Sequence, residues 1–168
     1  SPEGLRADWT AGHNGYFKEP GGHYHVELCP SKPGALDLLQ QWAEERLRAF
    51  QAVGLDYLCI WPYDQGGCTC ADCAPWGSKG FLTCAEPLAR LYKTYYPQGK
   101  VILSTWYFDH FIQGEWAGLA ETFSKQPGWV DLLLADDYGD QFPPFLVDHG
   151  APGELPVIGF PEISMYRC

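Results

Sequence analysis

The sequence predicts an α/β fold with parallel strands, formed by a single domain over residues 1–168. Apolar segments with strand character alternate along the chain with amphipathic segments. The connections between the apolar segments are long enough for the crossovers that parallel strands require. Most of these segments also end in acidic residues, and parallel α/β folds build their sites at the edge of the sheet where the strands end.

Several segments have the pattern of strands. The first alternates apolar and polar residues, whereas the second is almost continuously apolar, which is typical of a strand buried on both faces. No helix is predicted in the proline-rich stretch 139–154, which is too irregular. The predicted strands are residues 23–29, 55–64, 100–109, 129–138 and 155–164.

Three intervening segments have the pattern of helices. In the first, apolar residues recur on one face at intervals of three or four, and Gly54 ends the helix. The second follows a T-x-x-E capping box formed by Thr83 and Glu86. Pro127 and Gly128 end the third. The predicted helices are residues 31–54, 84–96 and 114–126.

Two architectures fit this order of elements. One is a partial, half-length TIM-type (β/α)8 barrel of about five parallel strands, and the alternative is an open flavodoxin-like sheet. A complete barrel takes about 250 residues, so a chain of 168 residues favours the half-length form. Because such a unit would expose apolar edges, we expect a homodimer in which a second copy covers them. No glycine-rich nucleotide-binding motif follows any predicted strand.

Composition and charge exclude some classes of partner. The net charge of −10 disfavours binding to nucleic acid and to anionic membrane surfaces. No apolar run approaches the roughly 20 residues that a membrane-spanning helix needs, and the first residues carry no signal-peptide core. We therefore expect a soluble protein, and the sequence leaves open whether it is cytoplasmic or secreted.

The loop "WPYDQGGCTCADCAPWG", residues 61–77, contains a C-x-C-x-x-C motif. Cys68, Cys70 and Cys73 offer three thiolates at a spacing that suits a structural Zn²⁺ ion, which takes four ligands. Cys29, at the end of the preceding predicted strand, is the expected fourth ligand, because the ends of neighbouring parallel strands share an edge. The alternatives are Cys84 or the pair His23 and His25 as fourth ligand, two disulfides among the same cysteines, or free thiols.

This loop also carries a resemblance to a known family. Together with "LCPSKP" upstream and "FPEISM" near the end, it resembles a group of bacterial glycoside-hydrolase-like (β/α)8 barrels. That group is related to the α-glucuronidases and, more distantly, to the β-N-acetylhexosaminidase-type barrels. The resemblance covers roughly residues 26–165 and implies a carbohydrate substrate. This chain differs in ending directly after "PEISM", where members of the group continue through further strands.

The resemblance implies carboxyl groups at the strand ends that hydrolyse a glycosidic bond. Asp64 would be the general acid, although the α-glucuronidases use a glutamate there, and Asp137 and Glu162 would be the carboxylates on the base side. Asp136 competes with Asp137, because only one of two adjacent strand residues faces the site. Alternatively, Asp64 caps the glycine-rich turn through its backbone amides.

Aromatic residues gather at the same strand ends, where flat rings can stack on sugars. The candidates for substrate binding are Trp61, Tyr63, Trp76, Trp106 and Tyr138, and the alternative is that Trp61 and Trp106 fill the core. Asp109 is expected to be a solvated strand end.

Three functions remain open: a glycoside hydrolase, a catalytically inactive barrel fragment that folds and dimerises, and a metal-thiolate or redox protein that uses the C-x-C-x-x-C motif.

Overall fold

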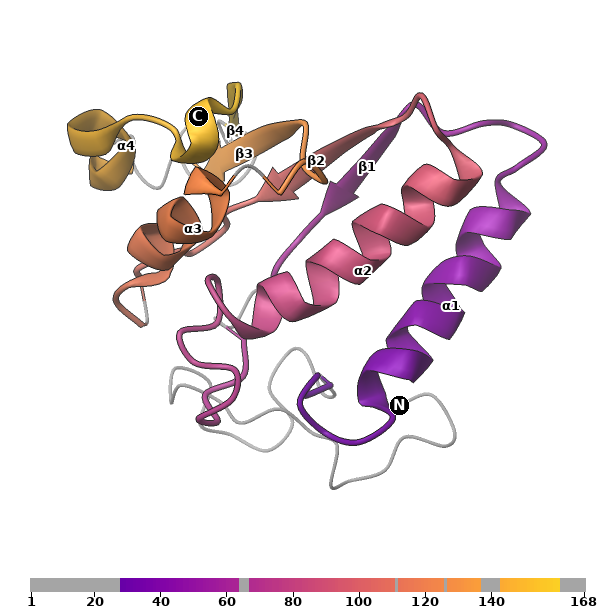
Figure 1. The fold of residues 1–168 in the computed structure, drawn as a ribbon, viewed down its shortest axis with the longest axis horizontal. Helices are drawn as coiled ribbons and strands as arrows, with labels where there is room; N and C mark the ends of the chain where they lie inside the picture. Colours follow the sequence, from indigo (N-terminus) through magenta and orange to yellow (C-terminus); the bar gives the residue numbers. More distant parts are fainter. Residues whose placement is uncertain (1–27, 64–66, 111, 126, 137–142, 161–168) are drawn as a thin grey trace, which may run out of the picture.

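The computed structural model describes residues 28–63, 67–110, 112–125, 127–136 and 143–160. A helix precedes the first strand, and each later strand is reached through a helical connection (Figure 1). In chain order the elements are α1 (Ala35–Ala49), β1 (Tyr57–Ile60), α2 (Gly80–Tyr95), β2 (Lys100–Ser104), α3 (Glu115–Ser124), β3 (Leu132–Asp136), α4 (Pro144–His149), the 3-10 turn η2 (Pro152–Glu154) and β4 (Val157–Phe160).

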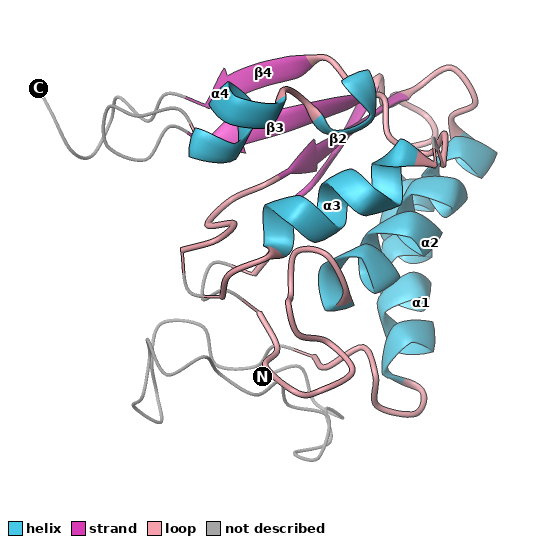
Figure 2. Ribbon diagram, turned by 60° about the vertical axis from the view of Figure 1, so that its left-hand side comes forward, coloured by secondary structure: helices cyan, strands magenta, loops and turns pink. Residues whose placement is uncertain are grey.

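The sheet has four parallel strands in the order β1-β2-β3-β4. Each strand therefore pairs with its neighbour in the chain, and right-handed crossovers of this kind place their helices on one face of a sheet. Figure 2 shows α1, α2 and α3 together on one side of the sheet. The predicted α/β fold with parallel strands is confirmed for these elements. A flavodoxin-like sheet reverses its strand order, and the described strands contain no such reversal.

The boundaries of the elements differ from the prediction in several places. Helix α1 runs only from Ala35 to Ala49, so it ends before Gly54, which was predicted to end it. The strands are shorter than their apolar runs, and of the predicted strand 23–29 only the last two residues are described. Helix α2 begins at Gly80, so the predicted capping box is not formed: the Thr83 hydroxyl donates to the carbonyl of Lys79 within the first turn. The short helix α4 lies within residues 139–154, where no helix was predicted.

The two faces of the sheet have different environments. Because side chains alternate along a strand, one set joins the inner faces of α2 and α3 in a single core, which includes Ile60, Val101, Leu103, Leu133 and Ala135. The opposite, open face carries large apolar side chains that remain exposed. They include Tyr57 (62%), Trp61 (37%), Ile158 (43%) and Phe160 (37%).

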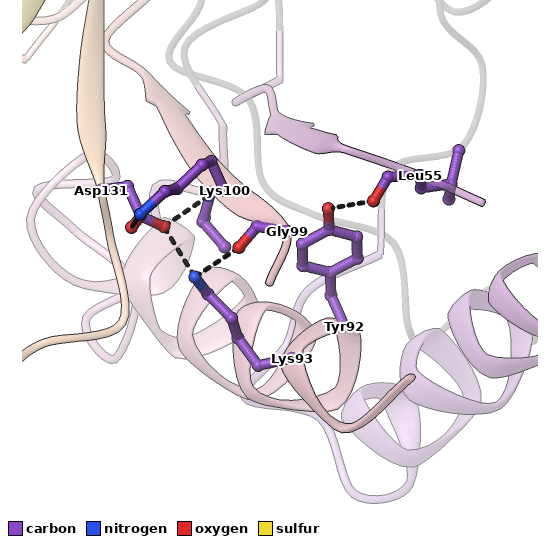
Figure 3. Close-up of polar contacts among 7 residues, drawn as sticks. Leu55, Tyr92, Lys93, Gly99, Lys100 and Asp131 are labelled. Atoms are coloured by element: carbon purple, nitrogen blue, oxygen red, sulfur yellow. Dashed lines mark hydrogen bonds and ion pairs between the residues drawn. The ribbon is translucent and has the colours of Figure 1, made fainter. Parts of the chain in front are cut away.

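A charged cluster joins the elements at the amino-terminal edge of the sheet (Figure 3). One carboxylate oxygen of Asp131 accepts hydrogen bonds from the backbone N–H of Val101 (2.7 Å) and from Lys93 Nζ (2.8 Å), and the other accepts one from Lys100 Nζ (3.1 Å). Burial opposes ionisation of Asp131, but these donors outweigh it and hold its pKa below the usual value. The cluster ties α2, β2 and the start of β3 together.

Replacing Asp131 by asparagine is expected to lower the free energy of unfolding by about 2 kcal/mol at pH 7, because it removes charge-assisted hydrogen bonds. Urea denaturation measures this loss. The matched control is Glu86→Gln, which removes an exposed pair with Arg90 on α2 and should cost about 0.5 kcal/mol or less. Because the folded pKa of Asp131 is depressed, its contribution is present above pH ~4 and is lost as the pH falls below that value. Equal losses for the two variants at pH 7 would contradict this role.

Candidate metal centre

Four cysteines lie together where β1 leads into the loop before α2. The sulfur atoms of Cys29, Cys68, Cys70 and Cys73 all lie within 4.8 Å of one another. Cys29 Sγ is 3.7 Å from both Cys70 Sγ and Cys73 Sγ. Cys70 is partly exposed and the other three are buried. We call this group the four-cysteine centre and residues 67–77 the cysteine loop.

The spacing of the sulfur atoms fits a tetrahedral metal ion. Four thiolates at a Zn–S distance of about 2.3 Å place their sulfur atoms about 3.8 Å apart, close to the two distances of 3.7 Å from Cys29. No disulfide joins these four cysteines in the structure, so the predicted alternative of disulfides among them is not formed. Cys29 joins the cluster as expected, Cys84 does not, and His23 and His25 lie outside the described residues.

The cysteine loop folds around the buried ring of Trp76. Gly67 has a φ of +76°, and a Cβ atom there would lie 2.0 Å from the Trp76 ring, so only glycine fits. A Cβ atom on Gly80 would likewise lie 2.5 Å from the same ring. Between them, the backbone N–H of Cys73 donates to the carbonyl of Cys70 (3.0 Å), which closes the turn that brings the two thiols to one side.

Tyr63 connects this loop to the segment that carries Cys29. Its ring stacks on Trp76 with 4.7 Å between the ring centroids, and its hydroxyl donates to the carbonyl of Leu28 (2.9 Å). Trp76 is only 2% exposed. Tyr63 and Trp76 were predicted to bind substrate. In the structure they pack against each other beside the four-cysteine centre, and together with Trp61 they line a cavity of about 250 Å³ next to α1.

The thiols of this region differ in how readily they ionise. Burial raises the pKa of Cys70, but hydrogen bonds from Ser31 and from the neighbouring cysteines outweigh that effect and lower the pKa to about 6. Burial raises the pKa of Cys73, and the nearby thiols add to the rise. Burial also raises the pKa of Cys84, to about 12. A metal ion at the centre would therefore have to displace at least the Cys73 proton at neutral pH.

Replacing Gly67 by alanine is expected to lower the free energy of unfolding by at least about 2 kcal/mol, because strain at a positive φ adds to a clash with Trp76. The control is Gly54→Ala, at a φ of +85° with no atom near the added Cβ. Gly54→Ala should lower the free energy of unfolding by only about 1 kcal/mol, because its only cost is the strain of a positive φ at a residue other than glycine. Thermal and urea unfolding of both variants measure the difference, and equal losses would show that the Trp76 contact does not restrict the loop.

Three aromatic rings meet over the open face of the sheet at its carboxyl edge. The ring centroid of Trp61, just after β1, lies 5.2 Å from that of Trp106 and 5.5 Å from that of Phe160, at the end of β4. Neighbouring strands lie about 4.8 Å apart, so the first and fourth strands of a flat sheet would be about 14 Å apart. The side chains of Trp61 and Phe160 therefore reach towards each other across the open face. We call Trp61, Trp106 and Phe160 the aromatic platform.

The other predicted site residues are placed only in part. Asp64, Asp137, Tyr138 and Glu162 lie outside the described residues, so the structure does not show whether carboxyl groups meet at this edge. Asp136 is the last residue of β3 and pairs with Phe160 in the sheet. The sequence analysis did not identify Phe160 as a site residue.

A buried carboxyl group beside the cysteine loop was also not identified from the sequence. Glu115, the first residue of α3, is 3% exposed and accepts hydrogen bonds from the backbone N–H of Gly77 (2.7 Å) and of Asp109 (2.8 Å). In return, the Glu115 N–H donates to a carboxylate oxygen of Asp109 (2.7 Å). Asp109 therefore caps α3 and is not the solvated strand end that was expected. Burial raises the pKa of Glu115 to about 7, although the two N–H donors oppose the rise.

Comparisons with protein-family models, with curated proteins and with solved structures found no match to this chain. The likeness to glycoside-hydrolase-type barrels therefore depends on the sequence motifs alone. Among the described residues, no helix has both the length and the apolar character needed to cross a membrane.

Proposed function

We propose that the four-cysteine centre binds one structural Zn²⁺ ion and thereby fixes the carboxyl edge of the sheet beside it. The observation that carries the proposal is the approach of four thiols to within 4.8 Å, with distances close to the edges of a ZnS₄ tetrahedron. Four sulfur ligands leave no open position, which is typical of structural and not of catalytic zinc. A redox role is less well supported, because it requires accessible thiolates and three of these four thiols are buried.

Metal analysis of the chain, purified under reducing conditions without chelator, tests the proposal. We expect one zinc ion per chain, which a chromophoric chelator removes with a loss of stability. Cys59→Ser is the control, because Cys59 is exposed on β1 and is not part of the cluster. This variant should keep the full zinc content. A reduced chain that neither contains nor takes up zinc would refute the proposal.

A second proposed function is carbohydrate binding at the aromatic platform, as in a partial barrel of glycoside-hydrolase type. Two rings of the platform, Trp61 and Phe160, are each 37% exposed, and stacking on sugars needs accessible ring faces of this kind. In this proposal Asp64 acts as the general acid, with Asp137 and Glu162 as the carboxylates on the base side. The sequential strand order and the helices on one face support the partial barrel.

Replacing Trp61 by alanine is expected to weaken binding of oligosaccharides, including uronides, by about tenfold, because a stacking face is lost. Calorimetric titration against a panel of such sugars measures the affinity. Phe50→Ala removes an exposed aromatic ring (50% exposed) at the C-terminal end of α1, outside the aromatic platform, and should leave the affinity unchanged. If the wild-type chain binds no sugar of the panel, or both variants lose affinity equally, the platform is not a carbohydrate site.

Hydrolysis and assembly are tested separately from binding. If the chain is a hydrolase, Glu162→Gln should abolish turnover of aryl glycosides while sugar binding persists. Light scattering on a size-exclusion column tests the proposed homodimer, in which a second copy covers the exposed apolar edges of the partial barrel and leaves the aromatic platform accessible. A dimer that binds sugar without turnover would favour the alternative of an inactive barrel fragment. A monomer would contradict the assembly.

A further inference from the structure

Glu115 links two loops that are distant in the sequence. Its two carboxylate oxygens accept one hydrogen bond each, from Gly77 at the end of the cysteine loop and from Asp109 in the loop after β2. The carboxyl group is 3% exposed, so water does not compete for these bonds. Both loops are therefore bound to the same side chain, which is fixed at the start of α3.

The two loops are also packed without free space. A Cβ atom on Gly77 would lie 2.5 Å from the ring of Phe108, and one on Gly118 of α3 would lie 2.5 Å from Ser78. Movement of the end of the cysteine loop would therefore push directly on Phe108 and on α3. Closely packed interiors transmit such displacements because they contain no voids that absorb them.

The hydrogen bond between Gly77 and Glu115 connects α3 to the four-cysteine centre. Gly77 directly follows Trp76, around which the cysteine loop folds, and the backbone N–H of Gly80 donates to the carbonyl of Cys73 (3.1 Å). The position of Gly77 is therefore set by the same turn that carries the thiol of Cys73. A metal ion that orders this turn would also order the donor to Glu115.

The hydrogen bonds between Asp109 and Glu115 connect α3 to the segment that carries Trp106 of the aromatic platform. Tyr107 and Asp109 both have a positive φ, of 59° and 61°. Aspartate adopts this region more readily than most residues, whereas for a bulky residue such as Tyr107 it is uncommon. Asp109 is held in this conformation by its two hydrogen bonds with Glu115. The ring of Tyr107 lies 4.8 Å from that of Trp106, a member of the platform. The Glu115 contact thus fixes the segment 104–110 at Asp109, while the backbone N–H of Thr105 at its start is held by the carbonyl of Leu134.

We propose that Glu115 is a positioning residue through which the four-cysteine centre, when it holds zinc, fixes the segment 104–110 and with it Trp106 of the aromatic platform. The inference depends on the proposed zinc centre and deepens the proposed function of the platform. Zinc and ligand binding would then be coupled through a single buried carboxyl group, although the two sites share no residue.

Hydrogen–deuterium exchange measured by mass spectrometry tests the coupling. In the wild-type chain, removal of zinc by a chelator should accelerate exchange in 104–110 at least tenfold, while 132–135 of β3 remains protected, which excludes global unfolding. The Glu115→Gln substitution replaces one carboxylate oxygen by an amide NH₂ group, which cannot accept a hydrogen bond. In the zinc-loaded variant, the N–H of Gly77 or of Asp109 therefore loses its acceptor. The segment 104–110 should then exchange as fast as in the zinc-free wild type and should not respond to the chelator, while zinc keeps the cysteine loop protected.

The matched control is Glu121→Gln, which removes an equal charge from an exposed position on the same helix and should retain the zinc-dependent protection. If Glu115→Gln does not fold, Glu115→Asp, which is too short to reach both donors, serves in its place. A chain that binds zinc but shows no chelator response in 104–110 would overturn only the coupling. A retained response in the Glu115 variants would overturn the role of Glu115. A chain that binds no zinc would overturn both this inference and the metal centre.

Discussion

Replacing Cys73 by serine is expected to lower the affinity of the chain for Zn²⁺ about 1,000-fold at pH 7.5. Structural zinc binding is worth about 10–16 kcal/mol in small domains with four ligands, so each ligand accounts for about 2.5–4 kcal/mol, and the upper end of this range corresponds to about 1,000-fold. Serine does not ionise at this pH and is a poor ligand for a borderline-soft metal. Because the Cys73 side chain is 1% exposed, water does not readily take its place. Competition with a chromophoric chelator measures the affinity.

Two further variants make this expectation specific. Cys59→Ser should leave the affinity unchanged, because Cys59 lies on the open face of the sheet and outside the cluster. Cys70→Ser should lose less affinity than Cys73→Ser, because Cys70 is partly exposed and a water molecule can occupy its position. Wild-type affinity in Cys73→Ser would show that the four thiols do not bind a common ion.

The fold could be predicted from the sequence because its main signals are local. Alternation of apolar and amphipathic segments gave the order of helices and strands, and the length of the connections gave their parallel direction. The ends of the strands were less predictable. An apolar run in the sequence can continue past the point where the hydrogen bonds between strands stop. Trp61, for example, follows the last residue of β1 but is as apolar as the residues within it. The start of α2 was missed because Thr83 bonds to a carbonyl within the helix instead of capping it.

The members of the four-cysteine centre were predictable from the sequence. Three ligands come from one short motif, and Cys29 was added on the expectation that a strand ending there would neighbour the next predicted strand. The structure places Cys29 in the cluster, but the described sheet has only β2 beside β1. Glu115 and Phe160 were missed because nothing in their local sequence distinguishes a buried, hydrogen-bonded carboxyl group or a platform ring from ordinary surface residues. The packing of Trp76 against Tyr63 was not predicted either, because composition alone does not reveal which face a ring presents. These three depend on contacts between distant segments.

The buried carboxyl group of Glu115 is expected to make the protein less stable as the pH rises from about 4.5 to about 7. Its pKa is raised to about 7 in the folded chain from 4.5 in the unfolded chain, so the folded state holds the proton more tightly within this range. Its contribution to stability is therefore fully present below pH ~4.5 and is lost as the pH rises through 7. At 1.36 kcal/mol per pKa unit, the loss amounts to about 3 kcal/mol.

Urea denaturation of the wild type and of Glu115→Gln at pH 5, 6, 7 and 8, with chelator present throughout, isolates this contribution. Thiol titration and the charge of the rest of the chain are common to both proteins and cancel in the difference. The stability of the wild type relative to Glu115→Gln should fall by about 2.5 kcal/mol between pH 5 and pH 8, whereas its stability relative to Glu121→Gln should stay constant, because that carboxyl group is exposed. A constant difference for Glu115→Gln would mean that Gly77 and Asp109 hold Glu115 ionised at every pH tested. The carboxyl group would then link the two loops as a permanent anion.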